Sequence, residues 1–269
     1  MPAAARQHDN TVEERTRQFY DNEGWVAGED GVSGEDAYFR NAAPERAAYD
    51  AKCERKARVL LAGVAGELLI AGPGDFPKSH SLTSEQFDVV QCVDISEQSL
   101  DICRTRLGDK GEYKLGSLLD LPVDNNSVDA ALCAHVLFHI DKDDQARAVS
   151  ELIRAVKPGG RVVFIYTNPH APLMRIQRLL KFFRVHKLLK ADKLYNFSHP
   201  PRWWETAAEG CSVKIHPYDV MSRNQMRALL PVAGLRKRAF AWASDFEDRN
   251  PAVAARLCSY IAIEINMPG

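Results

Sequence analysis

The feature that most constrains the fold is a change of pattern at Arg58. Beyond it, short apolar runs alternate with longer charged and amphipathic stretches, which is typical of a parallel sheet covered by helices. Five of these runs predict strands, at 68–71, 89–93, 113–115, 130–134 and 162–166, of which the third is weak. Such an alternation predicts a doubly wound α/β fold, whose ligands bind at the carboxyl ends of the strands.

Helix boundaries between the runs support this fold. Ser96 can cap a helix that runs to Leu107, and Asp141 can start another that ends at the turn 157–160. The loops after the first four strands therefore meet at one edge of the sheet. Functional side chains are expected at that edge.

The last third of the chain adds two strands, which makes seven in a mostly parallel sheet. Ser222 and Gln225 form a capping box before a short helix that runs through Leu230. The apolar, partly alternating runs 238–242 and 257–266 then predict a C-terminal antiparallel hairpin.

The chain divides into two expected parts. Residues 1–55 are polar with scattered aromatic residues, and we expect a helical arm that acts as a lid. Residues 56–269 form the α/β domain, with a helical cap inserted at about 170–215. Large aromatic side chains left in water would each forfeit about 1.5–3 kcal/mol of burial, so those of the arm and cap are expected to cover the functional edge. They are Tyr20, Trp25, Tyr38, Trp203 and Trp204.

Composition excludes several classes of partner. A net charge of −1 provides no long-range field for nucleic acid, so we expect no such partner. The six cysteines form no C-x-x-C pair and predict buried free thiols without a metal site. No long apolar segment or signal peptide is evident, so we expect a cytoplasmic protein without stable membrane insertion. The oligomeric state does not follow from the sequence.

Two features at the ends of the first two strands indicate a nucleoside-containing ligand. The first strand runs into Gly72-Pro73-Gly74-Asp75, where two glycines allow positive φ angles and close approach of a ligand. Asp94 ends the second strand, where a carboxylate can accept both ribose hydroxyls of an adenosine. An ordinary tight turn and a solvated Asp are the alternatives.

Three more pieces follow in order. Gly116-Ser117-Leu118 ends the third strand, and Ala134-His135 begins the loop after the fourth. Lys157-Pro158-Gly159-Gly160 then precedes the fifth strand. These five motifs, in this order and at this spacing, indicate a function far more specifically than any single motif does.

From about Val59 to Tyr166, the chain resembles the core of the class I methyltransferases that use S-adenosylmethionine (SAM), in particular the methyltransferase type 11 group. The resemblance implies a Rossmann-like methyltransferase fold, SAM as cofactor, no metal, and methyl transfer to a small-molecule substrate. The cofactor-binding residues that it implies are Gly72, Gly74, Asp94, Ile95, Ser117, Leu118 and Ala134.

Two positions depart from the family pattern. The family commonly has an acidic residue two positions before the first glycine, where this chain has Ile70. An Asp usually meets the adenine amino group where this chain has Ser117, and a hydroxyl is the weaker acceptor. Each loss would weaken SAM binding by about 1–3 kcal/mol if nothing compensates.

Methyl transfer to a hydroxyl or amine also needs a group that takes a proton. His135 and His139 are the candidate catalytic residues, because they flank the expected methyl position and imidazole titrates near neutral pH. Packing beneath the loop is the alternative for each histidine. Tyr166 and His199 are further options.

Two other functions compete with a methyltransferase. An NAD(P)-dependent oxidoreductase also uses a glycine turn and an acid after the second strand, but its G-x-G-x-x-G motif needs a glycine where this chain has Pro77. A non-catalytic SAM-fold binding or scaffold protein is the second alternative, and it is motivated by Ile70 and Ser117. The accepting atom, whether O, N, C or S, stays open.

Overall fold

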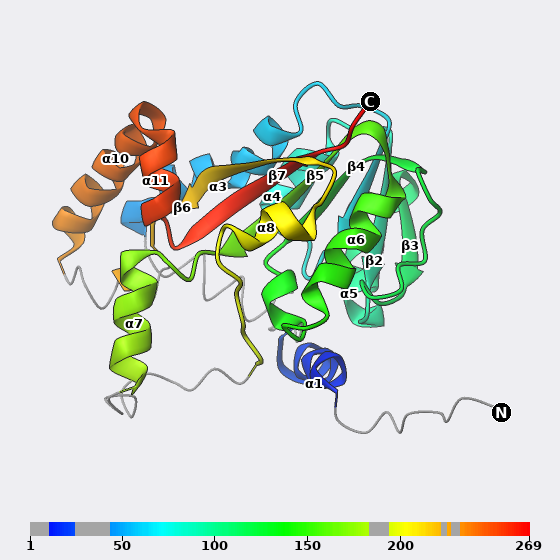
Figure 1. The fold of residues 1–269 in the computed structure, drawn as a ribbon, viewed down its shortest axis with the longest axis horizontal. Helices are drawn as coiled ribbons and strands as arrows, with labels where there is room; N and C mark the ends of the chain where they lie inside the picture. Colours follow the sequence, from blue (N-terminus) through cyan, green and yellow to red (C-terminus); the bar gives the residue numbers. More distant parts are fainter. Residues whose placement is uncertain (1–10, 25–43, 183–193, 222–224, 227–231) are drawn as a thin grey trace.

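The computed structural model describes residues 11–24, 44–182, 194–221, 225–226 and 232–269. They form a seven-stranded sheet in the order β3-β2-β1-β4-β5-β7-β6 (Figure 1). Strands β1 to β5 pair in parallel, and β7 is antiparallel to both of its neighbours. The strands are β1 (Glu67–Ala71), β2 (Val89–Asp94), β3 (Gly111–Leu115), β4 (Val128–Ala134), β5 (Val156–Thr167), β6 (Ser212–Asp219) and β7 (Tyr260–Asn266). The predicted doubly wound, mostly parallel sheet is confirmed.

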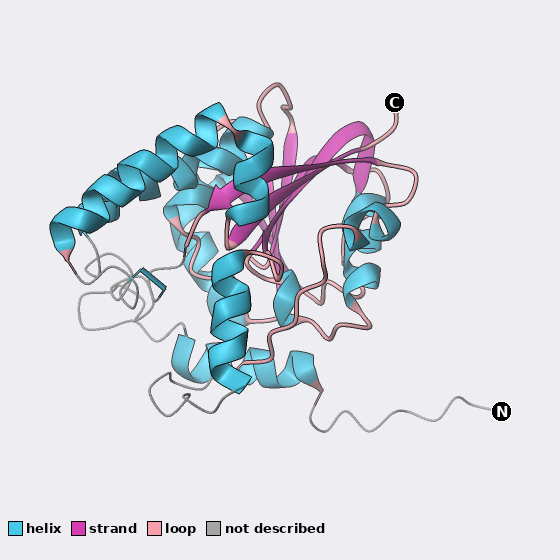
Figure 2. Ribbon diagram, turned by 60° about the vertical axis from the view of Figure 1, so that its left-hand side comes forward, coloured by secondary structure: helices cyan, strands magenta, loops and turns pink. Residues whose placement is uncertain are grey.

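The central strands are continuous apolar runs because helices cover both faces of the sheet (Figure 2). One face packs against α6 (Gln145–Ala155) and α8 (Trp203–Ala207). The other packs against α3 (Ala47–Leu60), α5 (Glu97–Leu107) and α10 (Ala233–Arg249). Strand β3 lies at the edge and has no buried residue, which explains its weak apolar signal.

Two predicted helix boundaries can be checked directly. The Ser96 hydroxyl caps α5 by accepting from the backbone N–H of Ser99 at 3.4 Å, and α5 ends at Leu107 as predicted. Helix α6 ends at Ala155, before the predicted turn 157–160. That turn lies inside β5 as an irregularity, because the pairing with β4 jumps from Val156 to Arg161.

The C-terminal antiparallel pair is confirmed, but its first strand was placed on the wrong residues. Residues 238–242 lie in α10, and the partner of β7 is Ser212–Asp219. Phe240 and Ala243, three residues apart, are buried whereas Trp242 is exposed, which is a helical pattern. The strand β6 escaped notice because it lies at the sheet edge and carries charged residues and a proline. The predicted helix from Ser222 lies outside the described residues except for 225–226.

The segments that flank the α/β core differ in how they join it. Helix α1 (Val12–Phe19) continues into a π-helical turn, Tyr20–Gly24, whereas α3 packs within the core, so the expected boundary at residue 55 falls inside a core helix. Between β5 and β6, the described part of the cap contains α7 (Pro172–Phe182) and α8. None of the described helices combines the length and apolar character that crossing a membrane requires.

Candidate functional site

The glycine turn after β1 needs its glycines. Gly72 has φ 70° and Gly74 has φ 56°, and Phe76, also left-handed at φ 50°, is buried beneath the turn. A Cβ on Gly72 would lie 2.4 Å from Cγ2 of Val136, which is far inside contact distance. The Gly72 N–H donates to the Val93 carbonyl at 2.8 Å, so glycine lets the turn lie tightly between β2 and the Val136 side chain.

Asp94, at the end of β2, is held by three hydrogen bonds. Its Oδ2 accepts from the Gly74 N–H at 3.3 Å and from the Ser99 hydroxyl at 2.8 Å. Its Oδ1 accepts from the Ser96 N–H at 2.9 Å. Burial raises the pKa of Asp94, and these donors oppose that rise. The backbone N–H of Ile95 is a fourth donor near this carboxylate, so a ligand hydroxyl would share or replace one of these contacts.

The remaining predicted cofactor residues lie along the same edge. Ile95 follows Asp94 and is half-buried, as is Ala134 at the end of β4. The Ser117 hydroxyl accepts from the Leu119 N–H at 3.0 Å, and Leu118 is buried in the core.

Ile70 is fully buried within β1. It pairs with Cys92 and Leu132 on the neighbouring strands and belongs to the apolar core. Ile70 therefore provides no carboxylate for a ligand at this position.

His135 begins the loop after β4 in a left-handed conformation, with φ 64°. This is uncommon for a residue with a side chain, and its N–H is anchored to the Ile165 carbonyl at 3.0 Å. Its imidazole is solvent-accessible, yet the rings of Tyr260, Tyr218 and Phe138 lie 5.2, 5.8 and 6.3 Å from it. Desolvation of the imidazole among these rings lowers the pKa of His135 to about 4, and the charge of His139 contributes. His135 is thus neutral near pH 7.

His139 is half-buried, and its Nδ1 lies 2.8 Å from the Tyr195 carbonyl. A carbonyl only accepts, so Nδ1 carries the proton and Nε2 is the basic nitrogen. The ring of Tyr20, from the N-terminal arm, meets His139 edge-on at 6.3 Å.

The two further candidate bases, Tyr166 and His199, take part in contacts between the cap and the core. The Tyr166 hydroxyl donates to Gln145 at 2.6 Å and accepts from the His199 N–H at 2.9 Å. Burial raises the pKa of Tyr166, which makes its ionisation harder. The imidazole of His199 stacks on Trp203 with 4.2 Å between ring centroids.

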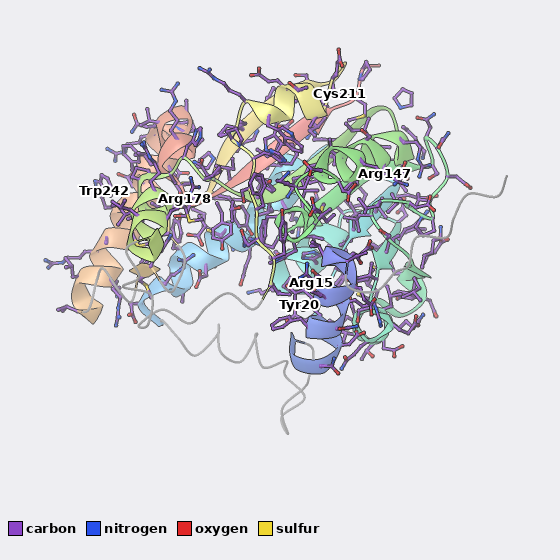
Figure 3. The ribbon with its side chains drawn as sticks, turned by 60° about the horizontal axis from the view of Figure 1, so that its bottom comes forward. Arg15, Tyr20, Arg147, Arg178, Cys211 and Trp242 are labelled. Carbon is purple, nitrogen blue, oxygen red and sulfur yellow. The ribbon has the colours of Figure 1, made fainter. Side chains whose placement is uncertain are left out.

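The arm touches the edge at two points. The Ser96 hydroxyl, after β2, donates to Asp21 of the arm at 2.5 Å, and Tyr20 meets His139 after β4. Figure 3 shows Tyr20 beside α1 at this end of the molecule. Of the other aromatic residues expected in the lid, Trp204 is fully buried against Phe164 and Tyr166, whereas Trp25 and Tyr38 lie outside the described residues.

Three residues at this edge escaped sequence reasoning. Tyr218 is the second-last residue of β6, the strand that was misplaced, and Tyr260 begins β7. His80 lies in the short helix α4 (Lys78–Ser84), where a polar sequence gave no sign of burial, yet it is only 3% exposed. Burial lowers the pKa of His80 to about 3, and repulsion from the charge of His135 contributes.

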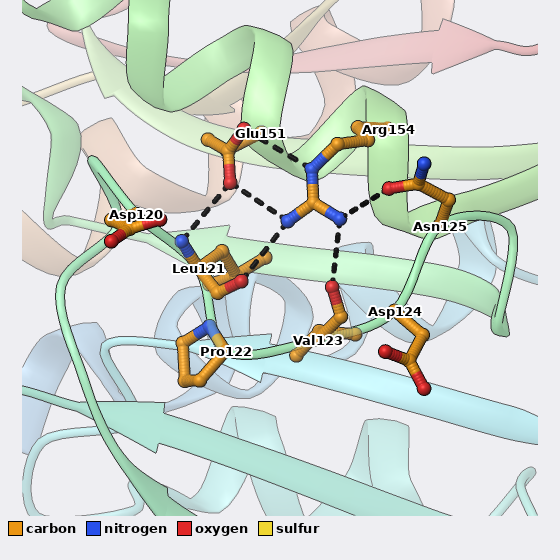
Figure 4. Close-up of a pocket in the computed structure, with 8 residues that line it drawn as sticks. All are labelled: Asp120, Leu121, Pro122, Val123, Asp124, Asn125, Glu151 and Arg154. Carbon is orange, nitrogen blue, oxygen red and sulfur yellow. Dashed lines mark hydrogen bonds and ion pairs between the residues drawn. The ribbon is translucent and has the colours of Figure 1, made fainter.

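A separate pocket of about 620 Å³ lies between the β3–β4 loop and α6 (Figure 4). Its most prominent cation, Arg154, bonds to Glu151, Asn125 and the carbonyls of Leu121 and Val123. These contacts use the guanidinium to hold the loop on the helix. The pocket includes none of the predicted site residues.

The described residues contain no group of three or more His, Cys, Asp or Glu side chains placed to hold a metal ion. All six cysteines are free thiols, and only Cys211 among them is not buried. The predicted buried thiols are therefore confirmed for the other five.

The core of the chain is similar to known methyltransferases. Residues 70–164 match the family model described as "Methyltransferase domain". The demethylmenaquinone methyltransferase of Clavibacter sepedonicus is 34% identical over 119 residues, which cover 43% of this chain and 47% of that protein. The ubiquinone/menaquinone biosynthesis C-methyltransferase UbiE of Burkholderia vietnamiensis is 29% identical, with 62% of this chain and 65% of that protein covered. The matches thus span from about half to just under two thirds of these relatives.

Solved structures share the fold over nearly the whole chain. The N-methyltransferase NodS of Bradyrhizobium japonicum, in complex with S-adenosyl-L-homocysteine, has a TM-score of 0.58 at 12% identity and covers 95% of this chain and 100% of its own. The geranyl diphosphate C-methyltransferase of Streptomyces coelicolor has a TM-score of 0.57 at 18% identity and covers 97% and 98%. At these identities the likeness shows a common fold.

Proposed function

We propose that this chain, which carries a class I methyltransferase domain of the type 11 group, transfers a methyl group from SAM to a small-molecule acceptor. One observation supports the proposal most strongly. The glycine turn and Asp94 form one hydrogen-bonded unit, in which the Gly74 N–H bonds the Asp94 carboxylate at 3.3 Å. This unit lies at the carboxyl edge of the sheet, where doubly wound folds bind their ligands.

The residues at the edge fit SAM. Gly72 lies against Val136 with no space for a Cβ, so only glycine fits in the turn that would lie beside the methionine part of the cofactor. Asp94 would accept a ribose hydroxyl by sharing or exchanging one of its present contacts, and Ile95 would flank the ribose. Ser117 and Leu118 would border the adenine, and Ala134 would face the methyl end.

When bound, SAM supplies an electrophilic methyl group on a sulfonium that is already a good leaving group. The protein must then align a nucleophile and exclude water. The loop after β4 carries out the alignment, with His135 held in a left-handed conformation beside three aromatic rings. The arm covers the edge from Ser96 to His139 and limits access of water.

A proton leaving the acceptor has two nearby sites. Neutral His135, with a pKa of about 4, is a hydrogen-bond acceptor and a weak base. The Nε2 atom of His139 is the stronger candidate base, because the Tyr195 carbonyl fixes its tautomer. His139 would take the proton, and His135 would orient the acceptor.

Isothermal titration calorimetry with SAM and S-adenosylhomocysteine tests the proposal. Binding of both in the micromolar range is expected for an enzyme of this class. A folded protein that binds neither would contradict the proposal and favour a non-catalytic role for the domain.

A further inference from the structure

Three adjoining helices carry most of the exposed large apolar side chains of the described residues. Six of the ten lie on α7, α10 and α11 (Pro251–Leu257). Trp242 is 65% exposed, and the other five are between 41% and 56% exposed. Single exposed apolar residues are ordinary, but a concentration of them marks an interaction surface. The six are Ile176, Leu179, Leu235, Trp242, Val253 and Leu257.

The three helices form one continuous region of the molecule. Helix α10 leads directly into α11. The side-chain amide of Asn168, directly after β5, contacts three backbone carbonyls at the end of α11 and so joins it to the start of α7. These carbonyls belong to Ala255, Arg256 and Cys258, at 3.2, 3.3 and 3.1 Å. Figures 1 and 2 both show the three helices together, and Figure 1 places them at the opposite end of the molecule from β3.

The same helices carry cations that the protein does not neutralise. Five exposed basic residues on them have no ion-pair partner among the described residues, namely Arg175, Arg178, Lys237, Arg238 and Arg256. Helix α7 contains no acidic residue, and all three acidic residues of α10 are paired with a base. The pairs are Asp245–Arg249, Glu247–Lys56 and Asp248–Lys52, at 3.1, 2.8 and 2.8 Å. This apolar–basic face is therefore positive, although the chain as a whole has a net charge of −1.

Apolar and basic side chains occur next to each other on each helix. On α10, Leu235, Arg238 and Trp242 are spaced so that they share one side of the helix. The Trp242 ring stacks on Phe246 with 5.1 Å between centroids. On α7, Ile176 and Leu179 are three residues apart, and Arg175 borders them. Helices that lie on a membrane surface have this composition, with Trp at the headgroup level and cations at the lipid phosphates.

We propose that the apolar–basic face docks this protein reversibly onto the surface of an anionic lipid bilayer. The apolar side chains would enter the headgroup region, and the unpaired cations would bind lipid phosphates. Charge favours a bilayer over a second copy of this chain, because the cations of two copies would face each other across such a contact. The inference does not depend on the proposed methyl transfer.

Co-sedimentation of the full chain with sucrose-loaded vesicles tests the docking. One set of vesicles contains phosphatidylglycerol and phosphatidylcholine in equal amounts, and the other contains phosphatidylcholine alone. We expect binding to the anionic vesicles to be at least about tenfold tighter than to the neutral ones. The binding should weaken as NaCl is raised from about 0.1 M to about 0.5 M, because salt screens exposed charges.

Charge reversal tests whether these helices make the contact. The double variant Arg175→Glu, Arg238→Glu changes one exposed cation on each of two helices and should bind the anionic vesicles at least about tenfold more weakly. The double variant Arg147→Glu, Arg202→Glu is the matched control, because it makes the same change of net charge at exposed positions outside the face. Figure 3 shows Arg147 well away from Arg178 and Trp242. Equal losses in the two double variants would overturn the assignment of the face.

The apolar part of the face is tested at Trp242. Trp242→Ser should weaken vesicle binding about tenfold, and the effect should persist at the higher salt concentration, because burial of an apolar ring is not screened. Val59→Ser, at a 67% exposed position on α3, is the control and should bind like the wild type. Brominated lipids should quench the tryptophan fluorescence of the wild type, and Trp242→Phe should lose much of this quenching. Unchanged quenching in Trp242→Phe would overturn the docking geometry.

Two further results would overturn the bilayer as the occupant. The first is a folded chain that does not bind anionic vesicles, with folding checked by thermal melting. The second is a dimer, seen by sedimentation equilibrium without vesicles, that Trp242→Ser dissociates, since the face would then bind a second copy. Calorimetric titration with SAM is a separate measurement, so failure of the proposed methyl transfer would leave the docking intact.

Discussion

The two halves of the functional edge are built differently. On the β1–β2 side, the Asp94 carboxylate already has three protein donors, from Gly74, Ser96 and Ser99. In the other half, which comprises the loop after β4 and helix α4, the His135 ring is accessible and the Nε2 of His80 has no partner among the described residues, and both rings have aromatic neighbours. The first half is organised by hydrogen bonds within the protein, whereas the second contains a buried imidazole nitrogen that no described residue satisfies.

The chain segments explain the difference. The glycine turn and Asp94 follow or end two consecutive strands, β1 and β2. The backbone geometry of these strands therefore brings them to the same edge of the sheet. The second half combines α4, β4, β6 and β7, which are joined only by the complete sheet. We therefore expect changes in the first half to alter cofactor affinity, and changes in the second to alter turnover.

The largest effect should come from Gly72→Ala. The new Cβ would meet Val136 at 2.4 Å and would also be strained at φ 70°, so we expect a loss of about 2–4 kcal/mol in stability or in SAM binding. Calorimetric titration and thermal melting together measure it. Gly63→Ala is the control, because Gly63 has φ 85° but nothing within 4 Å of its Cβ position.

The clash can be isolated further. Val136→Ala removes both methyl groups nearest to the new Cβ, so the double variant Gly72→Ala, Val136→Ala should bind SAM better than Gly72→Ala alone. If the single variant binds SAM like the wild type, the turn does not approach the cofactor, and the assignment of the first half is wrong.

Asp94→Ala should come next. Removing a carboxylate that bonds the ribose should weaken SAM binding by about tenfold or more, equivalent to roughly 1.5–3 kcal/mol. Asp101→Ala, on the exposed side of α5, removes the same charge without touching the edge. Equal SAM affinity in a folded Asp94→Ala protein and in this control would refute the ribose contact.

The sequence predicts the first half better than the second, because only the first depends mainly on local backbone and spacing. The glycines and Asp94 were identified because their chemistry depends on local backbone and on regular spacing along the chain. The order of the sheet followed from buried apolar runs, whereas β6 was missed because an edge strand with Lys214, His216 and Pro217 lacks such a run. Tyr218 could not be predicted because it lies on that strand, and His80 could not because the polar sequence of α4 gave no sign that this helix is partly buried.

The pH dependence of the unfolding free energy should show that His80, in the second half, is buried in its neutral form. His80 has a pKa of about 3 in the folded protein, against about 6.5 when unfolded, so the unfolded chain binds more protons between these values. Stability is therefore retained above pH 6.5 and lost as the pH falls. From pH 7 to pH 5 the wild type should lose about 2 kcal/mol more than His80→Leu.

Urea unfolding at the two pH values measures this difference. The raised pKa values of Asp94 and Asp219 oppose the trend, but they occur in both proteins and cancel in the comparison. Parallel losses in wild type and His80→Leu would mean that His80 is not held neutral by burial. The contrast between a satisfied and an unsatisfied half would then lose its strongest support.

The smallest effect should come from Ser117→Asp. This change adds a second carboxylate acceptor, beside Asp94, to the first half. The Ser117 hydroxyl accepts from the Leu119 N–H at 3.0 Å, and an Asp carboxylate can accept the same bond, so the loop should keep its shape. Its second oxygen would be a stronger acceptor for the adenine amino group, and SAM should bind about three- to tenfold tighter. Ser117→Ala is the control for the loop, because it removes the bond to Leu119 and adds no acceptor. Calorimetric titration of both variants with SAM measures the difference. Weaker SAM binding by a folded Ser117→Asp protein would mean that residue 117 does not border the adenine, and the cofactor half would then end at β2.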